Sequence, residues 1–129
     1  MIDTQRMDDL QRRVHKDPAS IAFAPLAEDL RRAGQYQQSV DLCRAGLAIH
    51  PGYLSARVTL GRALIDLDQI DEARQQLEDV RQRAPENSAA IRALEDLQRR
   101  VDHLRVVRTL AALEQWLTAI DVSRTHRRA

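Results

Sequence analysis

Side chains that could do chemistry are scattered through this sequence, and their spacing fits no catalytic or metal-binding pattern. No histidine has a second one at ligand spacing; the four are His15, His50, His103 and His126. Three acidic residues, Asp66, Asp68 and Asp71, resemble a calcium loop only superficially, because no glycine follows them and Leu77 stands where the bidentate glutamate belongs. No glycine-rich phosphate loop is present. The sequence therefore predicts no enzyme activity, no metal site and no cofactor.

Cys43 is the only cysteine, which excludes an internal disulfide and a multi-cysteine metal site. Since it falls on an apolar helical stripe, we expect a buried and inert thiol. The first 18 residues are charged and contain no apolar run, and no window approaches the roughly 18 apolar residues of a membrane-spanning helix. These features favour a protein without a signal peptide in a reducing, cytoplasmic compartment.

The elements that hold these side chains are expected to be helices. The chain has 129 residues and is 43% hydrophobic, 30% charged and only 3% aromatic, a composition poor in strand formers. Apolar residues recur at helical spacing in five segments, and a sixth begins near Asn87; the five are 4–16 (with Ile2 just before it), 20–33, 36–49, 53–67 and 70–83. A net charge of +1 gives no general attraction to nucleic acid.

Local signals set the expected helix ends. Ser20 should cap the second helix, and Pro25 should delay its start or kink it. Asp68 should cap the fifth helix. The sixth begins with the apolar positions Ile91, Leu94 and Leu97, and after Val101 the apolar periodicity shifts, which indicates either a bend near residues 101–105 or one long helix with a rotated apolar face.

The segments repeat. Pro18, Pro51 and Pro85 stand 33 and 34 residues apart, each at the end of a second helix. The same pattern of residue sizes lies twice between them: Phe23-x-x-Leu26-Ala27-x-x-Leu30 followed by Ser39 and Cys43, and Arg57-x-x-Leu60-Gly61-x-x-Leu64 followed by Ala73 and Leu77. This pattern resembles the tetratricopeptide repeat.

The small residues of the pattern explain its packing. Ala27 and Gly61 would let each first helix approach its partner closely. Arg57 departs from the pattern, because a large apolar residue belongs there; we expect its stem to cover the core and its guanidinium to reach solvent. Further departures are Glu95, where a small residue belongs, and Gln98, where an aromatic one does.

The resemblance implies an all-α, right-handed superhelix (an α-solenoid) of tetratricopeptide-like helical hairpins, with about seven helices and a longer C-terminal capping helix. It would form a single domain over residues 1–129. The expected parts are an N-terminal half-repeat or cap (4–18), repeat 1 (20–51), repeat 2 (54–85), a degenerate repeat and capping helix (88–122), and a basic tail that should fray (123–129).

The resemblance also implies a function: non-catalytic protein–protein interaction, with a peptide or helix bound in the concave groove. Helix geometry assigns to that groove Glu28, Arg31, Val58, Arg62, Ile65, Arg92 and Arg99. The trio Val58, Arg62 and Ile65 is the best candidate surface, because its apolar character is not required by the repeat; the alternative is a partly shielded surface without a role. The face used by chaperone-tail adaptors of this family has Arg62 but no nearby Asn, so the resemblance does not extend to them.

A second feature is a C-terminal seam at spacings of four and three, namely Val106, Leu110, Leu113, Leu117 and Ile120, with Trp116 beside it. This seam either packs onto the preceding hairpin or associates with another chain. The alternative function is therefore an oligomerisation or assembly subunit that self-associates through its C-terminal helix. The basic tail (Arg124, His126, Arg127 and Arg128) is expected to be solvated, and binding to nucleic acid or acidic lipid is the less favoured reading.

Overall fold

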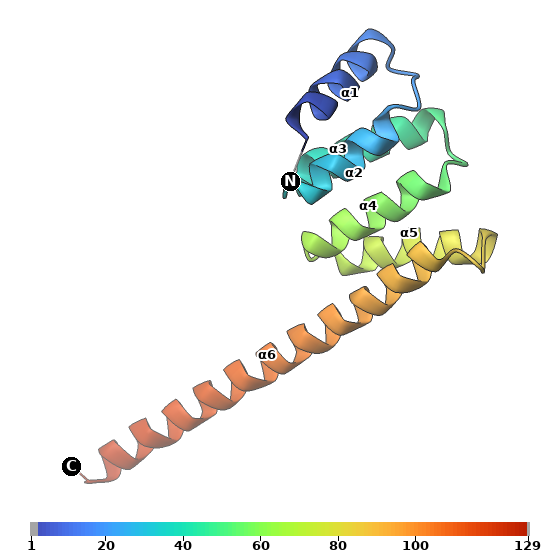
Figure 1. Cartoon of the computed structure of the whole chain (residues 1–129). Helices are drawn as coiled ribbons and strands as arrows, with labels where there is room; N and C mark the ends of the chain where they lie inside the picture. The colour runs from blue at the N-terminus through green and yellow to red at the C-terminus, as the bar shows by residue number, and fades with distance from the viewer. Residues whose placement is uncertain (1–2, 129) are drawn as a thin grey trace. The chain divides into compact units, whose positions relative to one another are not determined.

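The computed structural model describes residues 3–128, and within them the chain forms six helices and no strand (Figure 1). The helices are α1 (Thr4–Lys16), α2 (Phe23–Arg32), α3 (Tyr36–Ile49), α4 (Leu54–Asp66), α5 (Ile70–Arg83) and α6 (Ser88–Arg128). Ile2 and Ala129 lie outside the described residues.

The chain divides into two units, Met1–Leu97 and Gln98–Ala129. The first contains α1 to α5 and the beginning of α6, whereas the second consists of the remainder of α6. The prediction of one domain over residues 1–129 stays a prediction.

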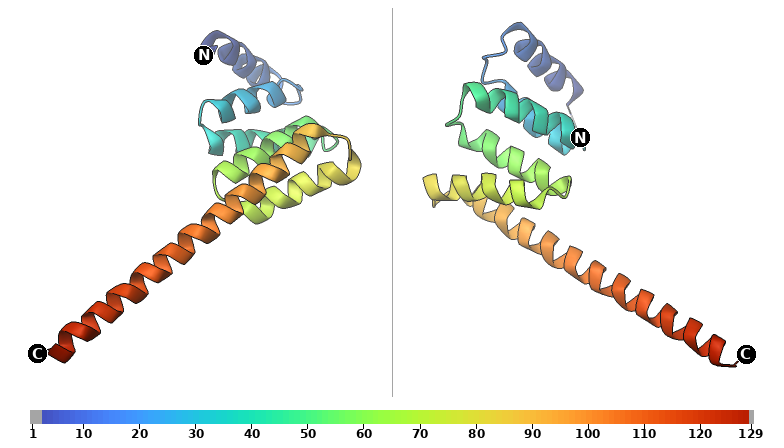
Figure 2. Two further views of the ribbon diagram at one scale, coloured as in Figure 1. Left: turned by 60° about the horizontal axis from the view of Figure 1, so that its bottom comes forward. Right: turned by 180° about the vertical axis from the view of Figure 1, so that it is seen from behind.

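The first unit is a stack of helical hairpins. Each helix from α1 to α4 contacts the next one, and α2 also contacts α4, so the first helices of successive hairpins are neighbours (Figures 1 and 2). The largest fully buried side chains come from both helices of each hairpin and from α6: Phe23, Val40, Leu64, Leu77, Val80 and Leu97. This arrangement confirms the predicted all-α fold of stacked hairpins.

The α2–α3 and α4–α5 turns share the same backbone conformation. Gly34 and Asp68 both have positive φ, at 81° and 59°. In each turn the next residue, Gln35 or Gln69, donates its amide hydrogen to a carbonyl oxygen five residues earlier, at 2.9 Å in both cases. Asp68 therefore ends α4 in a left-handed conformation, and the prediction that it caps α5 was wrong; Gln69 occupies that cap position without a side-chain hydrogen bond.

The start of α2 follows the sequence signals in part. The helix begins at Phe23, which confirms the late start expected from Pro25, now in the first turn where a missing amide hydrogen costs little. Ser20 lies three residues before the helix, and its hydroxyl accepts a hydrogen bond from the amide of Ala22 at 3.2 Å. The serine thus stabilises the preceding turn and is not the cap residue of α2.

Arg57 does not send its guanidinium to solvent as expected. Its side chain is largely buried and donates to the carbonyl oxygen of Pro51 at 2.7 Å and to the side chain of Gln76 at 3.0 Å. Its Nε also lies 3.4 Å from Asp79, in a geometry that makes an ion pair without a hydrogen bond. Polar partners from α5 and the preceding loop therefore replace the apolar contacts of the repeat pattern.

The sixth helix decides between two open alternatives and departs from two other expectations. It is one uninterrupted helix from Ser88 to Arg128, which is the alternative of one long helix over residues 101–105, so residues 3–128 contain six helices in place of about seven. It reaches Arg128, through the described part of the predicted fraying tail, because no glycine or proline interrupts that segment. In its first turns the fully buried residues are Ala90, Ala93 and Leu97, while Ile91 is 39% exposed. Of the three expected apolar positions only Leu97 is therefore fully buried, and small side chains supply the rest of the buried face.

Two glycines mark the closest helix contacts. A Cβ added at Gly61 would lie 2.6 Å from Cγ of Leu77, which confirms that α4 and α5 approach closely at this residue. A Cβ at Gly46 would overlap the ring of Phe23, a contact between α3 and α2 that the sequence pattern did not indicate. Both helix pairs can therefore pack this closely only because the residue at the contact is glycine.

We predict that Gly61→Ala lowers the free energy of unfolding by about 1–2 kcal/mol, because the overlap with buried Leu77 exceeds the gain in helix propensity. Chemical denaturation followed by circular dichroism measures the change. Gly52→Ala is the control: nothing lies within 4 Å of its added Cβ, and its effect should stay within about 0.5 kcal/mol. Equal effects of the two substitutions would contradict the close-contact explanation.

Candidate functional site

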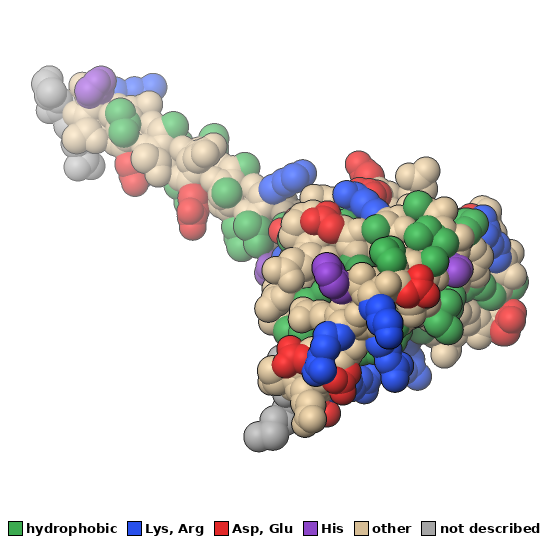
Figure 3. Space-filling model, turned by 90° about the horizontal axis from the view of Figure 1, so that it is seen from above, with side chains coloured by type: hydrophobic (Ala, Val, Ile, Leu, Met, Phe, Trp, Pro, Cys, Tyr) green, Lys and Arg blue, Asp and Glu red, His purple; other side chains and the backbone are tan. Residues whose placement is uncertain are grey.

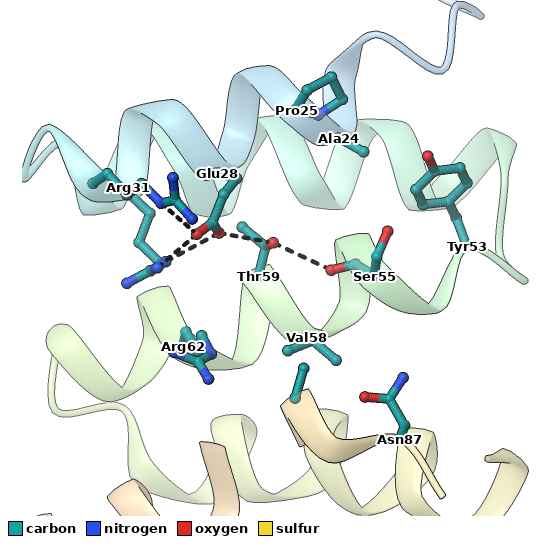
Figure 4. A pocket seen from close by; sticks show the side chains of 12 residues that line it. Ala24, Pro25, Glu28, Arg31, Tyr53, Ser55, Val58, Thr59, Arg62 and Asn87 are labelled. Atoms are coloured by element: carbon teal, nitrogen blue, oxygen red, sulfur yellow. Dashed lines mark hydrogen bonds and ion pairs between the residues drawn. The ribbon is translucent and has the colours of Figure 1, made fainter. Parts of the chain in front are cut away.

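A pocket of about 640 Å³ lies in the first unit, where α2, α4 and the start of α6 meet (Figure 4). It is the surface formed by the first helices of successive hairpins. The lining residues are Ala24, Pro25, Glu28, Arg31, Arg32, Tyr53, Ser55, Val58, Thr59, Arg62, Asn87 and Ala89. We call this pocket the groove.

Glu28 is the centre of a hydrogen-bond network that ties α2 to α4. Arg31 donates to its carboxylate from two nitrogens, at 2.7 and 3.2 Å, and Arg32 donates at 3.1 Å. From α4, the hydroxyl of Thr59 lies 3.1 Å from the same carboxylate and 3.2 Å from the carbonyl oxygen of Ser55 (Figure 4). One carboxylate therefore serves donors on two neighbouring first helices.

This network favours the charged forms of its members. Burial by itself raises the pKa of Glu28, but the hydrogen bonds from Arg31 and Thr59 and the charges of Arg31 and Arg32 outweigh it, so the pKa lies below its ordinary value of 4.5. The hydrogen bond to Glu28 in turn raises the pKa of Arg31. Arg31 also lies 4.0 Å from Asp66, so its charge is balanced within the protein.

Arg62 differs from the other two arginines of the groove. Its side chain is half-buried, lies on α4 beside Val58, and makes no hydrogen bond or ion pair within residues 3–128 (Figure 4). Arg31 and Arg32 share Glu28, whereas the positive charge of Arg62 is not neutralised by any described residue. The groove therefore carries an unbalanced positive charge at Arg62. Such a guanidinium suits a carboxylate, which it can bind through two parallel hydrogen bonds.

Of the seven groove residues predicted from the sequence, the structure brings four together: Glu28, Arg31, Val58 and Arg62. Arg92 is exposed but does not line the groove, and Arg99 belongs to the second unit. Ile65 does not line it either. Val58 and Ile65 are only 5% and 8% exposed, so these two side chains belong mainly to the packing of α4 and not to an open apolar surface.

Four polar residues that line the groove were not predicted from the sequence as groove residues: Tyr53, Ser55, Thr59 and Asn87. Ser55 and Thr59 stand four apart in α4, and that spacing is the signal that places both on one helix face. Asn87 corrects the expectation that no Asn lies near this face. Its Oδ1 accepts a hydrogen bond from the amide of Ala90 at 3.0 Å, so it caps α6 and lines the groove at once.

Cys43 is the other residue whose side chain could be reactive, and its thiol is buried and free of any disulfide. Burial raises the pKa of its thiol to about 12, and a hydrogen bond with Ser39 offsets only part of that effect. Almost no thiolate therefore exists at neutral pH, which agrees with the expected inert thiol.

Within residues 3–128 no three His, Cys, Asp or Glu side chains group so that they could hold a metal ion. Among the helices of residues 3–128, none combines the length and the apolar character that a membrane span requires.

Comparisons with known proteins agree with this geometry. A sequence model of a family described as tetratricopeptide repeat matches residues 30–97. The bacteriophage adsorption protein A of Escherichia coli K12 is 28% identical over 107 residues, which make up 83% of this chain and 11% of that protein. The chain thus spans about a tenth of the length of this relative.

Solved structures show the same fold. The first tetratricopeptide domain of Spaghetti (RPAP3), bound to the HSP90 peptide SRMEEVD, matches with a TM-score of 0.69 at 21% identity over 74% of this chain and 77% of that one. The second such domain of human RPAP3, in complex with the HSP70 peptide SGPTIEEVD, matches with a TM-score of 0.66 at 22% identity over 71% of this chain and 78% of that one.

We predict that Glu28→Gln lowers the free energy of unfolding at pH 7 by about 1–3 kcal/mol, because Arg31 and Arg32 lose a charged acceptor. Since the folded pKa of Glu28 is lowered, its contribution is complete above about pH 4.5 and declines as the pH falls through the folded value. Denaturation curves between about pH 3 and 7 should therefore converge for wild type and variant at the acidic end. Exposed Glu86 supplies the control, Glu86→Gln; a constant difference at every pH would contradict the assignment.

We predict that Cys43 reacts with a thiol reagent such as iodoacetamide only when the protein unfolds, because the thiol is buried and its pKa is about 12. Mass spectrometry after a timed exposure at pH 8 measures the reaction, with a denatured sample as the positive control. Labelling of the native protein at the rate of a denatured sample would show that Cys43 is accessible.

Proposed function

The chain belongs to the tetratricopeptide repeat family, and on that premise we propose that its first unit is a non-catalytic interaction module that binds a peptide or helix in the groove. The recognised segment carries a carboxylate that pairs with Arg62. The remaining groove residues shape the site around that contact.

The observation that carries this proposal is the state of the groove arginines. Arg31 and Arg32 already share Glu28, and Arg31 also has Asp66, so these two cations need no ligand. Arg62 is half-buried and has no partner among residues 3–128, so its desolvation is not compensated within the protein. A ligand carboxylate would supply the missing charge and hydrogen bonds.

The peptides in the related structures supply probes of suitable chemistry. SRMEEVD and SGPTIEEVD each contain two Glu and one Asp in their last four residues. At 21–22% identity the likeness shows the fold alone, so these sequences serve as acidic probes and do not identify the natural partner.

The experiment measures binding of fluorescently labelled heptapeptides by polarisation, with an acidic series that includes SRMEEVD and the same peptides with Glu and Asp replaced by Gln and Asn. We expect the wild type to prefer acidic peptides. We expect Arg62→Glu to weaken that binding by about 10- to 100-fold, because a charge-assisted hydrogen-bonded pair is lost and a like charge is added.

A matched control is available on the second helix of the hairpin. Arg74→Glu makes the same charge change on α5, at an exposed residue outside the groove, and should leave binding within about twofold. Circular dichroism checks that both variants keep their helicity. Equal affinity for acidic and neutral peptides, or full binding by the Arg62 variant, would overturn the proposal.

A further inference from the structure

The second unit leaves apolar side chains without a neighbouring element of their own unit. It consists of one helix, and seven of its large apolar residues are about half-exposed: Val106 (55%), Val107 (47%), Leu110 (55%), Leu113 (50%), Trp116 (62%), Leu117 (55%) and Val122 (53%). Figure 3 shows hydrophobic side chains at the surface along this part of α6. An amphipathic helix of this kind becomes stable when its apolar face is covered.

The spacing of the seam residues indicates what kind of element would cover them. Val106, Leu110, Leu113, Leu117 and Ile120 follow one another at intervals of four, three, four and three residues. In heptad terms Val106, Leu113 and Ile120 occupy d positions, and Leu110 and Leu117 occupy a positions. Within these turns the opposite face holds small or polar residues such as Ala111 and Gln115. Two exposed valines lie off the seam, Val107 at an e position beside it and Val122 at an f position just after its last residue. The narrow stripe of the seam, with a period of 3.5, is the pattern of a helix that packs against another helix.

We propose that this seam pairs with the seam of a second copy of the chain, with the two helices parallel. The proposal rests on unit 2 alone and is independent of the function proposed for the groove. In a parallel pair each a residue faces the same a residue and each d residue the same d residue. The five seam positions then form five consecutive apolar layers.

An antiparallel pair cannot use all five residues. In that orientation a positions pack against d positions, and the seam offers three d residues but only two a residues. The third d residue would face one of the polar a positions beyond the ends, His103 or Arg124. The parallel orientation therefore buries more apolar surface.

The edges of the seam are also compatible with parallel pairing. Residues at g face residues at e five positions later in the second helix. Thr109 would thus face Glu114 of the second copy, and Trp116 would face Asp121 of the second copy. Neither pair brings like charges together.

The ends of the seam limit the strength of the pair. One heptad after Leu117, the next a position is Arg124, and in a parallel pair it faces Arg124 of the second copy. Each of the ten seam side chains of the pair removes on the order of 100 Å² of apolar surface from water, so the two helices together bury about 1,000 Å², near the lower limit of specific interfaces. A dissociation constant in the micromolar range is expected.

Sedimentation equilibrium of the full chain from about 1 to 200 µM tests the proposal. We expect a monomer–dimer equilibrium for the wild type and a monomer for Leu113→Asp/Leu117→Asp. Ala111→Asp/Gln115→Asp is the matched control, because it places the same two charges four residues apart on the opposite face of the same helix and should dimerise like the wild type. A wild type that stays monomeric throughout this range, or a seam variant that still dimerises, would overturn the proposal.

A gain of affinity provides a variant that cannot fail merely by unfolding. Arg124→Leu adds a sixth apolar layer and removes a like-charge pair, so it should tighten the dimer at least about tenfold, whereas Thr125→Leu, off the seam, should not. Raising the salt concentration should tighten the wild-type dimer by screening Arg124. Unchanged affinity in Arg124→Leu would overturn the proposed register.

Orientation is tested by cross-linking in a Cys43→Ala background, which removes the only native thiol. Ile120→Cys should oxidise to a disulfide-linked dimer if the helices are parallel, since paired d residues lie within disulfide range. In either antiparallel register the two cysteines would be about 15–26 Å apart along the axis, too far to bond. A dimer that does not cross-link would overturn the parallel arrangement.

Discussion

The first unit depends on how closely its helices approach one another, and residues without a bulky side chain set that distance. At Gly61 the backbone of α4 lies against Leu77 of α5, and at Gly46 the backbone of α3 lies against the ring of Phe23. Phe23 and Leu77 are both fully buried, so the space that each glycine leaves is filled by a large side chain of the partner helix. These contacts fix the separation within each hairpin. Neighbouring first helices can then form a continuous surface, and the groove lies on that surface.

Size and spacing were the parts of the fold that the sequence made predictable. The period of Pro18, Pro51 and Pro85 and the small residue at Gly61 report on backbone geometry directly, because few other residues fit those positions. Polar positions were harder. Arg57 stands where the pattern wants an apolar residue, and only the three-dimensional arrangement reveals Gln76 and the Pro51 carbonyl as partners for its guanidinium. Asp68 is a common cap residue, yet its position matches that of Gly34 in the preceding hairpin, and the structure uses it as a turn residue.

The candidate site shows the same limit. Helix periodicity placed Glu28, Arg31, Val58 and Arg62 on one surface, and they line the groove together. Periodicity also places Arg31 and Arg32 three and four residues after Glu28, within reach of its carboxylate, but it could not show that Thr59 of α4 and Asp66 join this network or that Arg62 stays outside it. Nor could it show that Val58 and Ile65 are covered, since the side chains that cover them come from elsewhere in the fold. The absence of a partner for Arg62 among residues 3–128 appears only at the level of contacts.

Helix α6 is continuous, but the interactions that stabilise it change along its length. Its first turns are fixed by tertiary burial, since Ala90, Ala93 and Leu97 are fully inaccessible to solvent. Beyond Leu97 the helix belongs to a unit with no other element, so the helix–coil equilibrium of the segment itself decides whether it stays helical. Its Ala, Leu, Arg and Gln residues favour propagation of the helix, and the buried first turns already provide the nucleus. Opening of the backbone should therefore cost close to the global free energy at one end of this helix and progressively less toward the other. A single secondary-structure element thus carries a gradient of local stability, and whatever binds its distal part also sets how ordered that part is.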